Sequence, residues 1–402
     1  MNFSKSRQSL RFALVASLFL LLPACGADVE PVDKAPGVTE DEILIGSSSA
    51  LSGHASFLGT QYTHGALAWF REVNAGGGIH GRRIELISYD DQYDPPQTVA
   101  NTRKLIAEDQ VFMLFNYVGT PTSVKIIEPV HEAKIPAFGF FTGAEPLRTP
   151  FRPYMFHLRA SYYAEAEAAV AYFADQLGFS RIAVMYQDDA FGKAVLKGVE
   201  LALRRRSLPI AATGTYTRGQ LDVDQAVDII RESEAEAIVM VGTYTPLARF
   251  IRLCHAADYP PYFHTVSFVG SEAFAAEILQ QEIAPAHFEQ IIVTQVVPSP
   301  YSEQFPTVAD YRKLAGKYFP EDEPNFVALE GFLNARVLTE ALEAAGQNLT
   351  RGKLRLMFER MRDTDVGIGK ALSYGPLDHS GLEDVYYSRL GGDGIFQIFD
   401  PE

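Results

Sequence analysis

Apolar runs of strand length alternate with stretches of helical period along most of this chain. Residues 43–50 form a short apolar run that ends in small residues, which is typical of a buried parallel strand followed by a loop. From Ala66 the apolar positions recur every three to four residues, and three glycines at 76–78 end that pattern. Another apolar run begins at Ile84. This succession predicts a βαβ unit and a parallel sheet with right-handed crossovers.

The same alternation continues to the end of the chain. It predicts strands at 111–115, 135–138, 181–186, 210–216, 237–241 and 264–269, and helices at 223–233, 303–318, 327–345 and 350–361. The length exceeds that of one ordinary hydrophobic core, so two lobes are expected. We predict an α/β fold of two Rossmann-like lobes. Lobe 1 would span 41–160 with about 295–372, and lobe 2 would span 161–294 with about 373–402.

Polar turns follow two of the predicted strands. The letters NYVGTPTS occupy 116–123, and FFTGAEPLR occupies 140–148. Two such turns place hydroxyl and amide groups along the carboxyl edge of one sheet, where open α/β sheets bind ligands. Hydroxyls and free N–H groups at a helix start favour a carboxylate. Ordinary N-capping by Thr122 or Ser123 explains the first turn equally well.

The N-terminus has the features of an export signal. Residues 1–24 contain three basic residues and no acidic residue, and the apolar run FALVASLFLLLPA is short for a membrane span. The letters LPAC at 22–25 resemble a bacterial lipobox, which would leave Cys25 as a lipid-modified N-terminus. An ordinary secretory signal with an incidental cysteine is the alternative. Residues 25–40 are small, acidic and Pro-containing, as expected of a flexible tether.

Charge and cysteine content narrow the function classes. The chain carries 35 Lys and Arg against 50 Asp and Glu, a formal net charge of −15, and removal of the basic leader makes it more acidic. Such a protein is a poor candidate for binding nucleic acid or an anionic bilayer surface. Besides Cys25 only Cys254 is present, so an internal disulfide is not expected.

Several sequence matches to catalytic or cofactor motifs fail on context. Gly76, Gly78 and Gly81 spell G-x-G-x-x-G, but they follow a helix and precede a strand, the reverse of a dinucleotide site. His131 and Glu132 begin a zincin-like string in which Ile135 replaces the second histidine. No nucleophile elbow occurs, and the aspartate pairs at 90–91 and 188–189 follow strands, where turns explain them. We therefore predict no enzyme activity, no cofactor and no metal.

A long stretch of the first lobe resembles one protein family. The letters ALSG, then FLG, then EVNAGGGIHGRRIELISYDDQYDPPQTVANTRKLI, are similar to the opening of the branched-chain amino-acid-binding proteins, the type I periplasmic substrate-binding components of ABC importers. The similarity continues more thinly through the rest of the mature chain. It implies the type I fold, in which several crossing segments form a hinge and the ligand lies between the lobes.

The resemblance also implies ligand contacts. Thr120 occupies the place of the hydroxyl that holds the ligand carboxylate, and the next turn would contribute Phe141, Thr142 and Gly143. Where the family has small residues this chain has Phe140 and Phe141, and Phe191 replaces a tyrosine. The cleft tyrosine and the carboxylate that pairs with the ligand ammonium correspond to Tyr244 and Glu272.

These residues suit a zwitterion on chemical grounds as well. Thr120 and Thr142 could donate to a carboxylate, and Glu272 could accept from an ammonium group. The pocket wall would come from Leu58, Phe141, Phe191 and Tyr244. The alternatives are a solvated carboxylate at a helix start for Glu272 and ordinary core packing for the aromatic residues.

The predicted function is capture of a small ligand by an exported, lipid-anchored protein of the cell envelope and its delivery to an ABC permease with its ATPase. A branched-chain or other hydrophobic amino acid is the favoured ligand. The alternatives are a sensor of the same fold, or an importer component for an aromatic acid, an amide or urea. An enzyme such as a periplasmic hydrolase is disfavoured by the missing nucleophile and metal motifs.

Overall fold

Two separate sheets form the framework of the protein, as the two rounds of alternation predict. The computed structural model describes residues 35–281 and 283–401. The first sheet is entirely parallel, with the strand order β2-β1-β3-β4-β5. Its strands are β1 (Glu42–Ser49), β2 (Arg83–Asp90), β3 (Met113–Phe115), β4 (Ala137–Phe138) and β5 (Met155–Phe156).

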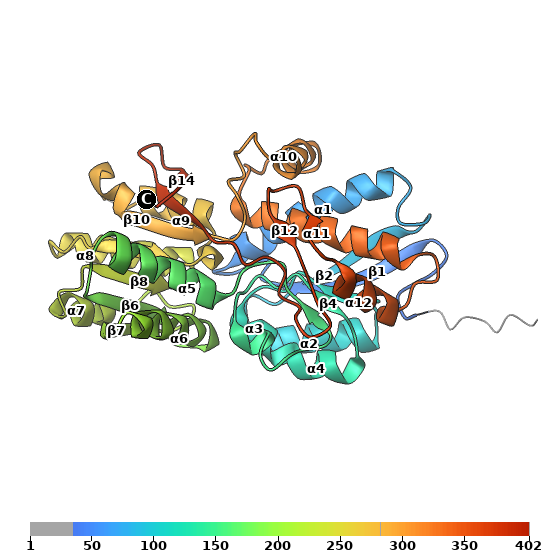
Figure 1. Cartoon of the computed structure of the whole chain (residues 1–402), viewed down its shortest axis with the longest axis horizontal. Helices are drawn as coiled ribbons and strands as arrows, with labels where there is room; N and C mark the ends of the chain where they lie inside the picture. The colour runs from blue at the N-terminus through green and yellow to red at the C-terminus, as the bar shows by residue number, and fades with distance from the viewer. Residues whose placement is uncertain (1–34, 282, 402) are drawn as a thin grey trace, which may run out of the picture. The chain divides into compact units, whose positions relative to one another are not determined.

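The second sheet has seven strands in the order β14-β13-β10-β9-β8-β6-β7. Five are parallel, and β13 pairs antiparallel with both of its neighbours. The strands are β6 (Ile182–Gln187), β7 (Ile210–Tyr216), β8 (Ala237–Val241), β9 (Tyr262–Thr265), β10 (Ile291–Gln295), β13 (Tyr386–Leu390) and β14 (Phe396–Phe399). The chain therefore ends in the second lobe (Figure 1).

Helices cover both faces of each sheet (Figure 1). The helices of the first lobe are α1 (Ser56–Ala75), α2 (Pro95–Ala107), α3 (Thr120–Ser123), α4 (Ile127–Ala133), α10 (Pro306–Tyr318), α11 (Phe326–Ala345) and α12 (Arg351–Arg360). Those of the second lobe are α5 (Tyr162–Val170), α6 (Ala190–Arg205), α7 (Asp224–Glu232), α8 (Tyr244–Ala256) and α9 (Ser271–Leu279). A short hairpin pairs β11 (Thr364–Asp365) with β12 (Ala371–Leu372).

The chain passes between the lobes near residues 157–161, 296–305 and 373–385. Two of these crossing segments lie side by side. The His157 N–H donates to the His379 carbonyl at 2.9 Å, and the Leu382 N–H donates to the Leu158 carbonyl at 2.7 Å. The hinge is therefore partly a two-stranded ribbon. The residue boundaries of the lobes given above stay a prediction.

Two expectations about single elements are wrong. Helix α1 begins at Ser56, ahead of the helical period that starts at Ala66. Glycine and threonine at 59, 60, 63 and 65 have low helix propensity and obscure the helical period there. The first turns of α1 are nevertheless helical, because their side chains are buried in the folded protein. The predicted strand at 264–269 ends at Thr265, and Ser267–Val269 forms a 3₁₀ turn, η4, which carries Phe268.

Helices α1 and α11 approach each other closely through two glycines. A Cβ atom on Gly65 would collide with the Ala328 carbonyl, and one on Gly331 would collide with the Tyr62 carbonyl. Only glycine fits at either position, because the obstacle is backbone and cannot move aside. This contact fixes the position of Tyr62 on α1 against Glu330 on α11.

We predict that Gly65→Ala destabilises the protein by about 1–3 kcal/mol, because the added methyl group must push two helices apart. Gly316→Ala is the matched control. Gly316 lies on exposed α10 with open space around it, so alanine there should be neutral or stabilising by about 0.5–1 kcal/mol. Urea unfolding of both variants measures this difference, and equal stabilities would contradict the proposed constraint.

Candidate functional site

The two polar turns of the first lobe lie side by side because the pairing of β3 with β4 continues past the strands. The Phe141 N–H donates to the Tyr117 carbonyl at 2.8 Å, and the Gly119 N–H donates to the Phe141 carbonyl at 3.2 Å. As a result the hydroxyls of Thr120 and Thr142 are 2.6 Å apart and fully buried. The sequence-predicted donor pair is thus present as one cluster.

Phe140 and Phe141 point in opposite directions. The Phe140 ring packs with Tyr117 and His157 in the core of the first lobe. The Phe141 ring points the other way, toward Tyr62 and Phe268, with centroids at 4.8 and 5.5 Å. Alternation along this extended segment points Phe141 away from the core of the first lobe and toward Phe268 of the second lobe.

Tyr162 completes this polar cluster from the start of α5. Its N–H donates to the Gly143 carbonyl at 2.7 Å, which fixes the predicted Gly143 turn against α5. A side chain on Gly143 would strike the Tyr162 backbone and ring. The Tyr162 hydroxyl is buried beside the Thr120 and Thr142 hydroxyls without a well-formed hydrogen bond to either, and burial raises the pKa of the phenol. It therefore stays protonated and can donate to a ligand.

A buried ion pair lies under the same cluster. Arg159 donates through Nε and Nη2 to the two carboxylate oxygens of Glu330, at 2.8 and 2.6 Å, and both side chains are almost completely buried. Burial alone lowers the pKa of Arg159, but Glu330 more than reverses this and the pKa is raised. The guanidinium also stacks on Phe141, with Cζ 4.3 Å from the ring centroid. Its Nη1 is buried without a partner.

Phe268 joins the two lobes. It comes from η4 of the second lobe, and its ring lies 5.5 Å from Phe141 and 5.9 Å from Tyr93, both in the first lobe. On its own lobe it packs on Phe191 at 4.5 Å, and Phe191 in turn contacts Tyr162 at 5.4 Å. We call these five rings, Tyr93, Phe141, Tyr162, Phe191 and Phe268, the interlobe aromatic cluster.

The second lobe adds a polar group beside this cluster. Asp189 caps α6 by accepting from the Phe191 and Gly192 N–H groups, at 2.9 and 3.3 Å, which positions the Phe191 ring. Arg218 lies 3.7 Å from the Asp189 carboxylate and 5.7 Å from the Tyr93 ring centroid. Asp189 thus has a structural role that also explains the aspartate pair at 188–189.

Leu58 and Tyr244 lie at one edge of the site. Leu58 is buried at the start of α1, and a Cβ atom on Gly270 would lie 2.6 Å from its Cδ2, so the lobes touch there. The Tyr244 ring packs edge-on against Phe57 at 6.4 Å and is half-buried. Both residues pack with the same apolar core as Phe141 and Phe191. The structure therefore brings the predicted wall residues together.

Glu272 lies at the start of α9, where that helix faces the first turn of α11. One carboxylate oxygen accepts from the Phe326 N–H at 3.2 Å, and the other is buried without a partner. Burial raises the pKa of the carboxyl to about 8. Glu272 is thus neither a freely solvated carboxylate nor, in this structure, hydrogen-bonded to the Thr120–Thr142 pair.

Arg159 and Phe268 contact Phe141, and Tyr93 contacts Phe268, but none of these three was among the candidates from the sequence. Phe268 lies in the segment 264–269 that was predicted as a strand, and the sequence gives no signal for Arg159. The signal for Tyr93 was the polar turn after β2, where Asp91 accepts from the Tyr93 N–H at 3.0 Å. The letters DDQYD could have been interpreted as a turn that presents an aromatic ring.

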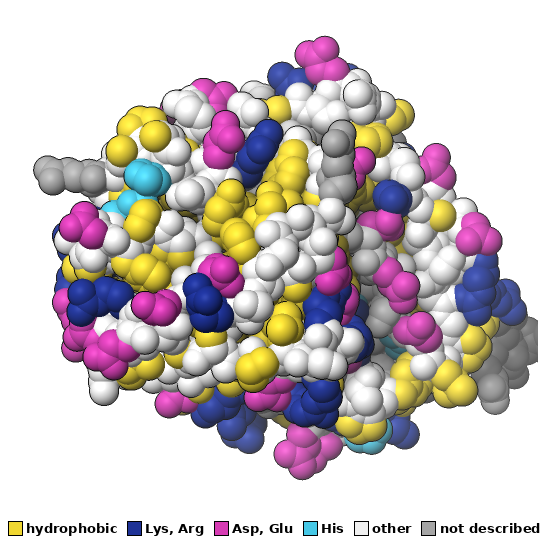
Figure 2. All heavy atoms as spheres, turned by 60° about the vertical axis from the view of Figure 1, so that its left-hand side comes forward, with side chains coloured by type: hydrophobic (Ala, Val, Ile, Leu, Met, Phe, Trp, Pro, Cys, Tyr) yellow, Lys and Arg dark blue, Asp and Glu magenta, His cyan; other side chains and the backbone are white. Residues whose placement is uncertain are grey.

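Within the described part of the chain, neither a candidate metal site nor a membrane-spanning helix accompanies these residues. Among residues 35–281 and 283–401, no cluster of three or more His, Cys, Asp and Glu side chains could hold a metal ion. No helix in the same part of the chain has the length and apolarity to cross a bilayer. On the face shown in Figure 2, acidic and basic side chains are interspersed, without a continuous basic stripe.

Known proteins with similar sequences are binding proteins. The model of the periplasmic binding protein family matches residues 42–394. An amino acid binding protein of Pseudomonas aeruginosa is 25% identical over 214 residues, which cover 52% of this chain and 57% of that protein. The Leu/Ile/Val-binding protein homolog 7 of Brucella abortus is 22% identical over 347 residues, 83% of this chain and 84% of that protein.

Solved structures agree with the sequence comparisons. A structure described as a possible leucine/isoleucine/valine-binding protein from Rhodopirellula baltica superimposes with a TM-score of 0.82 at 32% identity. The match covers 93% of this chain and 98% of that chain. The two-lobed type I fold implied by the resemblance is therefore confirmed.

We predict that Glu272→Gln changes how stability depends on pH. The folded protein holds the Glu272 proton more tightly than the unfolded chain, since the pKa rises from about 4.5 to about 8. The stabilisation by the protonated carboxyl is complete below pH 4.5 and is lost as the pH rises through 8. Glutamine stays neutral, so the variant should gain about 2 °C or more over wild type between pH 5 and pH 8.

Thermal unfolding of the ligand-free protein at several pH values measures this difference. The low-pH end is the internal control, because both side chains are neutral there. A melting-temperature difference that stays constant from pH 4 to pH 9 would show that Glu272 is not held in its neutral form.

Proposed function

This chain belongs to the periplasmic binding protein family, and from that membership we propose that it is the substrate-binding component of an ABC importer. It would capture a small hydrophobic amino acid, with a branched-chain side chain favoured, between its two lobes. It would then deliver the ligand to a membrane permease driven by a cytoplasmic ATPase. We further propose that the protein is held at the membrane by a lipid on Cys25.

The observation that carries the ligand proposal is the Thr120–Thr142 hydroxyl pair beside the Tyr162 hydroxyl. The three groups come from separate segments and share a buried position. The guanidinium of Arg159 lies nearby, but its charge is paired with Glu330, so the preference for an anion here comes from the hydroxyl donors and not from a net positive charge. A ligand carboxylate at this point would accept hydrogen bonds from the Thr120, Thr142 and Tyr162 hydroxyls.

The rings around this cluster favour an apolar side chain on the ligand. Phe141, Phe191 and Phe268 offer only hydrocarbon surface, and burying an apolar ligand side chain against them contributes about 25 cal/mol per Å². Because Phe268 and Phe191 belong to the second lobe and Phe141 to the first, the ligand would contact both lobes. Binding would then stabilise the closed arrangement that a permease can recognise.

Glu272 decides between two ligand classes. A zwitterion requires the ionised carboxylate near its ammonium group, and the unpartnered Glu272 oxygen is available for it. A pKa of about 8, however, leaves the ligand-free carboxyl mostly neutral at pH 7. That observation favours, as a second candidate, an aromatic or other apolar carboxylic acid that has no ammonium group.

We predict that one class of carboxylate ligand raises the melting temperature of the purified protein, since a ligand that binds only the folded state stabilises it by mass action. The screen would contain leucine, isoleucine, valine, phenylalanine, benzoate-type acids, amides and urea. The double variant Thr120→Val and Thr142→Val should bind the active ligand at least about tenfold more weakly, because each hydrogen bond to a charged group contributes about 1.5–3 kcal/mol. Thr215→Val, an exposed threonine on β7, is the matched control.

The outcomes separate the candidates. Binding of an amino acid that Glu272→Gln abolishes supports the zwitterion site. Binding of an aromatic acid that Glu272→Gln leaves intact supports the second candidate. Full affinity in the double threonine variant would place the ligand elsewhere and contradict both.

Lipid anchoring rests on the sequence alone, because Cys25 lies outside the described residues. We predict that Cys25→Ser releases the expressed protein from the membrane fraction without changing ligand affinity. Fractionation of cells that incorporate a labelled fatty acid checks both label and location. A wild-type protein that carries no label would contradict the lipobox interpretation.

A further inference from the structure

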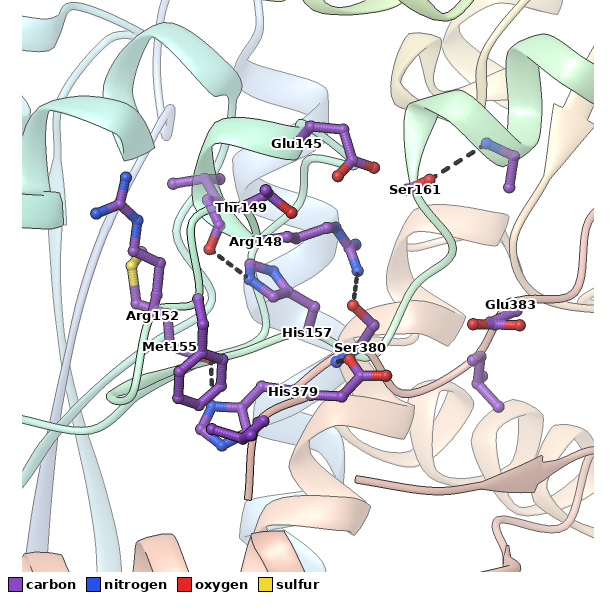
Figure 3. Close-up of a pocket in the computed structure, with 16 residues that line it drawn as sticks. Glu145, Arg148, Thr149, Arg152, Met155, His157, Ser161, His379, Ser380 and Glu383 are labelled. Atoms are coloured by element: carbon purple, nitrogen blue, oxygen red, sulfur yellow. Dashed lines mark hydrogen bonds between the residues drawn. The ribbon is translucent and has the colours of Figure 1, made fainter. Parts of the chain in front are cut away.

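A cavity lies away from the aromatic cluster, against the hinge. Its volume is about 520 Å³. It is lined by the turn 145–152, by the start of α5, and by two crossing segments that contribute His157 and Ser380 (Figure 3). Those two segments are the ones joined as a ribbon, so the cavity lies directly on the hinge.

Arg148 is the dominant polar group of this cavity. Its Nη1 donates to the Ser380 hydroxyl at 3.0 Å, and its Nη2 donates to the Arg159 carbonyl at 2.9 Å. Figure 3 shows the guanidinium extending over the cavity toward Ser380. The Nε group is buried without a partner. The second N–H groups of Nη1 and Nη2 form no hydrogen bond with the described residues, which leaves two donors for a ligand.

The charge of Arg148 is not neutralised by a direct partner. Within residues 35–281 and 283–401, no carboxylate lies within 4.0 Å of its guanidinium. Burial lowers the pKa of Arg148 to about 10, which still leaves it charged at neutral pH. Arg148 is half-buried, and its guanidinium donates only to neutral oxygens, so the site favours an opposite charge. Arg148 therefore points to an anionic ligand.

The two histidines of the cavity add no positive charge. Burial lowers the pKa of His157 well below its usual range and that of His379 to about 4. His157 donates through Nε2 to the Leu147 carbonyl at 3.2 Å, so its Nδ1, which is buried without a partner, is an acceptor. The positive charge available to a ligand comes from Arg148 and, nearer the surface, from Arg152, which also forms no ion pair in the described part of the chain.

Acidic side chains at the mouth limit the charge of the ligand. Glu145 is half-buried, whereas Asp378 and Glu383 are exposed, and all three line the cavity. Their charges repel a dianion more strongly than a monoanion. The planar guanidinium fork also matches the two oxygens of a carboxylate.

We propose that this hinge cavity is a second ligand site, which binds a small monocarboxylate through the Arg148 guanidinium. The ligand would contact both crossing segments of the ribbon at once. This site does not depend on the ligand proposed for the interlobe cluster, since it shares none of the residues of that cluster.

The test is an NMR titration of the full protein with sodium acetate at constant ionic strength. The Arg148 Nε–H group is buried, so its proton exchanges slowly and its cross-peak is observable. We expect a saturable shift of this peak and of the Ser380 and Ala164 amide peaks. Inorganic phosphate should bind at least about threefold more weakly, and sodium chloride should give no saturable shift.

Three variants complete the experiment. In Arg148→Gln the acetate-induced shifts of the Ser380 and Ala164 amide peaks should disappear. The control is Arg204→Gln, in which they should persist, because Arg204 is an exposed residue on α6 outside this cavity. Ser380→Ala keeps the charge but removes the hydroxyl that orients Nη1, so it should weaken acetate binding by about threefold even if Arg148→Gln does not fold. The proposal would be overturned by any of three results. These are a wild-type acetate titration without saturation, an acetate affinity that is unchanged in Ser380→Ala or Arg148→Gln, and tighter binding of phosphate than of acetate.

Discussion

The buried ion pair between Arg159 and Glu330 is the interaction on which the arrangement of the site depends. Arg159 lies where β5 leads into α5, and Glu330 lies on α11, so the pair ties a crossing segment to the helix core of the first lobe. The guanidinium supports the Phe141 ring, and Glu330 accepts weakly from the Tyr62 hydroxyl at 3.5 Å. Removing either partner would leave a buried charge, at a cost of about 3–5 kcal/mol.

The close contact of α1 with α11 makes this pair possible. Gly65 and Gly331 let the two helices approach until backbone meets backbone, and Tyr62 then reaches Glu330, Asn334 and the Gly139 carbonyl. Tyr62 on α1 thereby holds the turn after β4, and the continued pairing of Val118 with Phe141 holds the same turn against the segment after β3. The hydroxyls of Thr120 and Thr142 meet because both constraints act on the same few residues.

Much of this architecture follows from sequence, and the reasons are local. The strand at 237–241 is an uninterrupted β-branched and apolar run, and the structure has it at the same residues. Thr120 and Thr142 could be proposed because both lie in polar turns that follow strands of one sheet and the family resemblance gives them a role, whereas Phe191 was implied by the resemblance alone. By contrast, the partners of Arg159 and Phe268 are far away in the chain, and no periodicity identifies them. Helix α1 was predicted too short because tertiary burial outweighs the weak propensity of its first turns.

Aromatic rings form contacts between the two lobes. Phe268 contacts Tyr93 and Phe141 across the interface, and Leu58 lies against the Gly270 turn. Such contacts are stabilised by removal of apolar surface from water, which does not depend on direction. Hydrogen bonds to a ligand would therefore help to fix the orientation of one lobe relative to the other. Arg159 directly follows the hinge ribbon formed by residues 157–158 with 379–382, and its carbonyl accepts from Arg148, so both arginines belong to one hydrogen-bonded unit.

A crystal structure of the protein with the tightest ligand from the screen tests the central claim most directly. Our account predicts a ligand carboxylate within hydrogen-bond distance of the Thr120 and Thr142 hydroxyls, with Phe141 and Phe268 on opposite sides of its apolar part. A ligand bound without contact to either threonine, for instance only against Arg148 at the hinge, would contradict it.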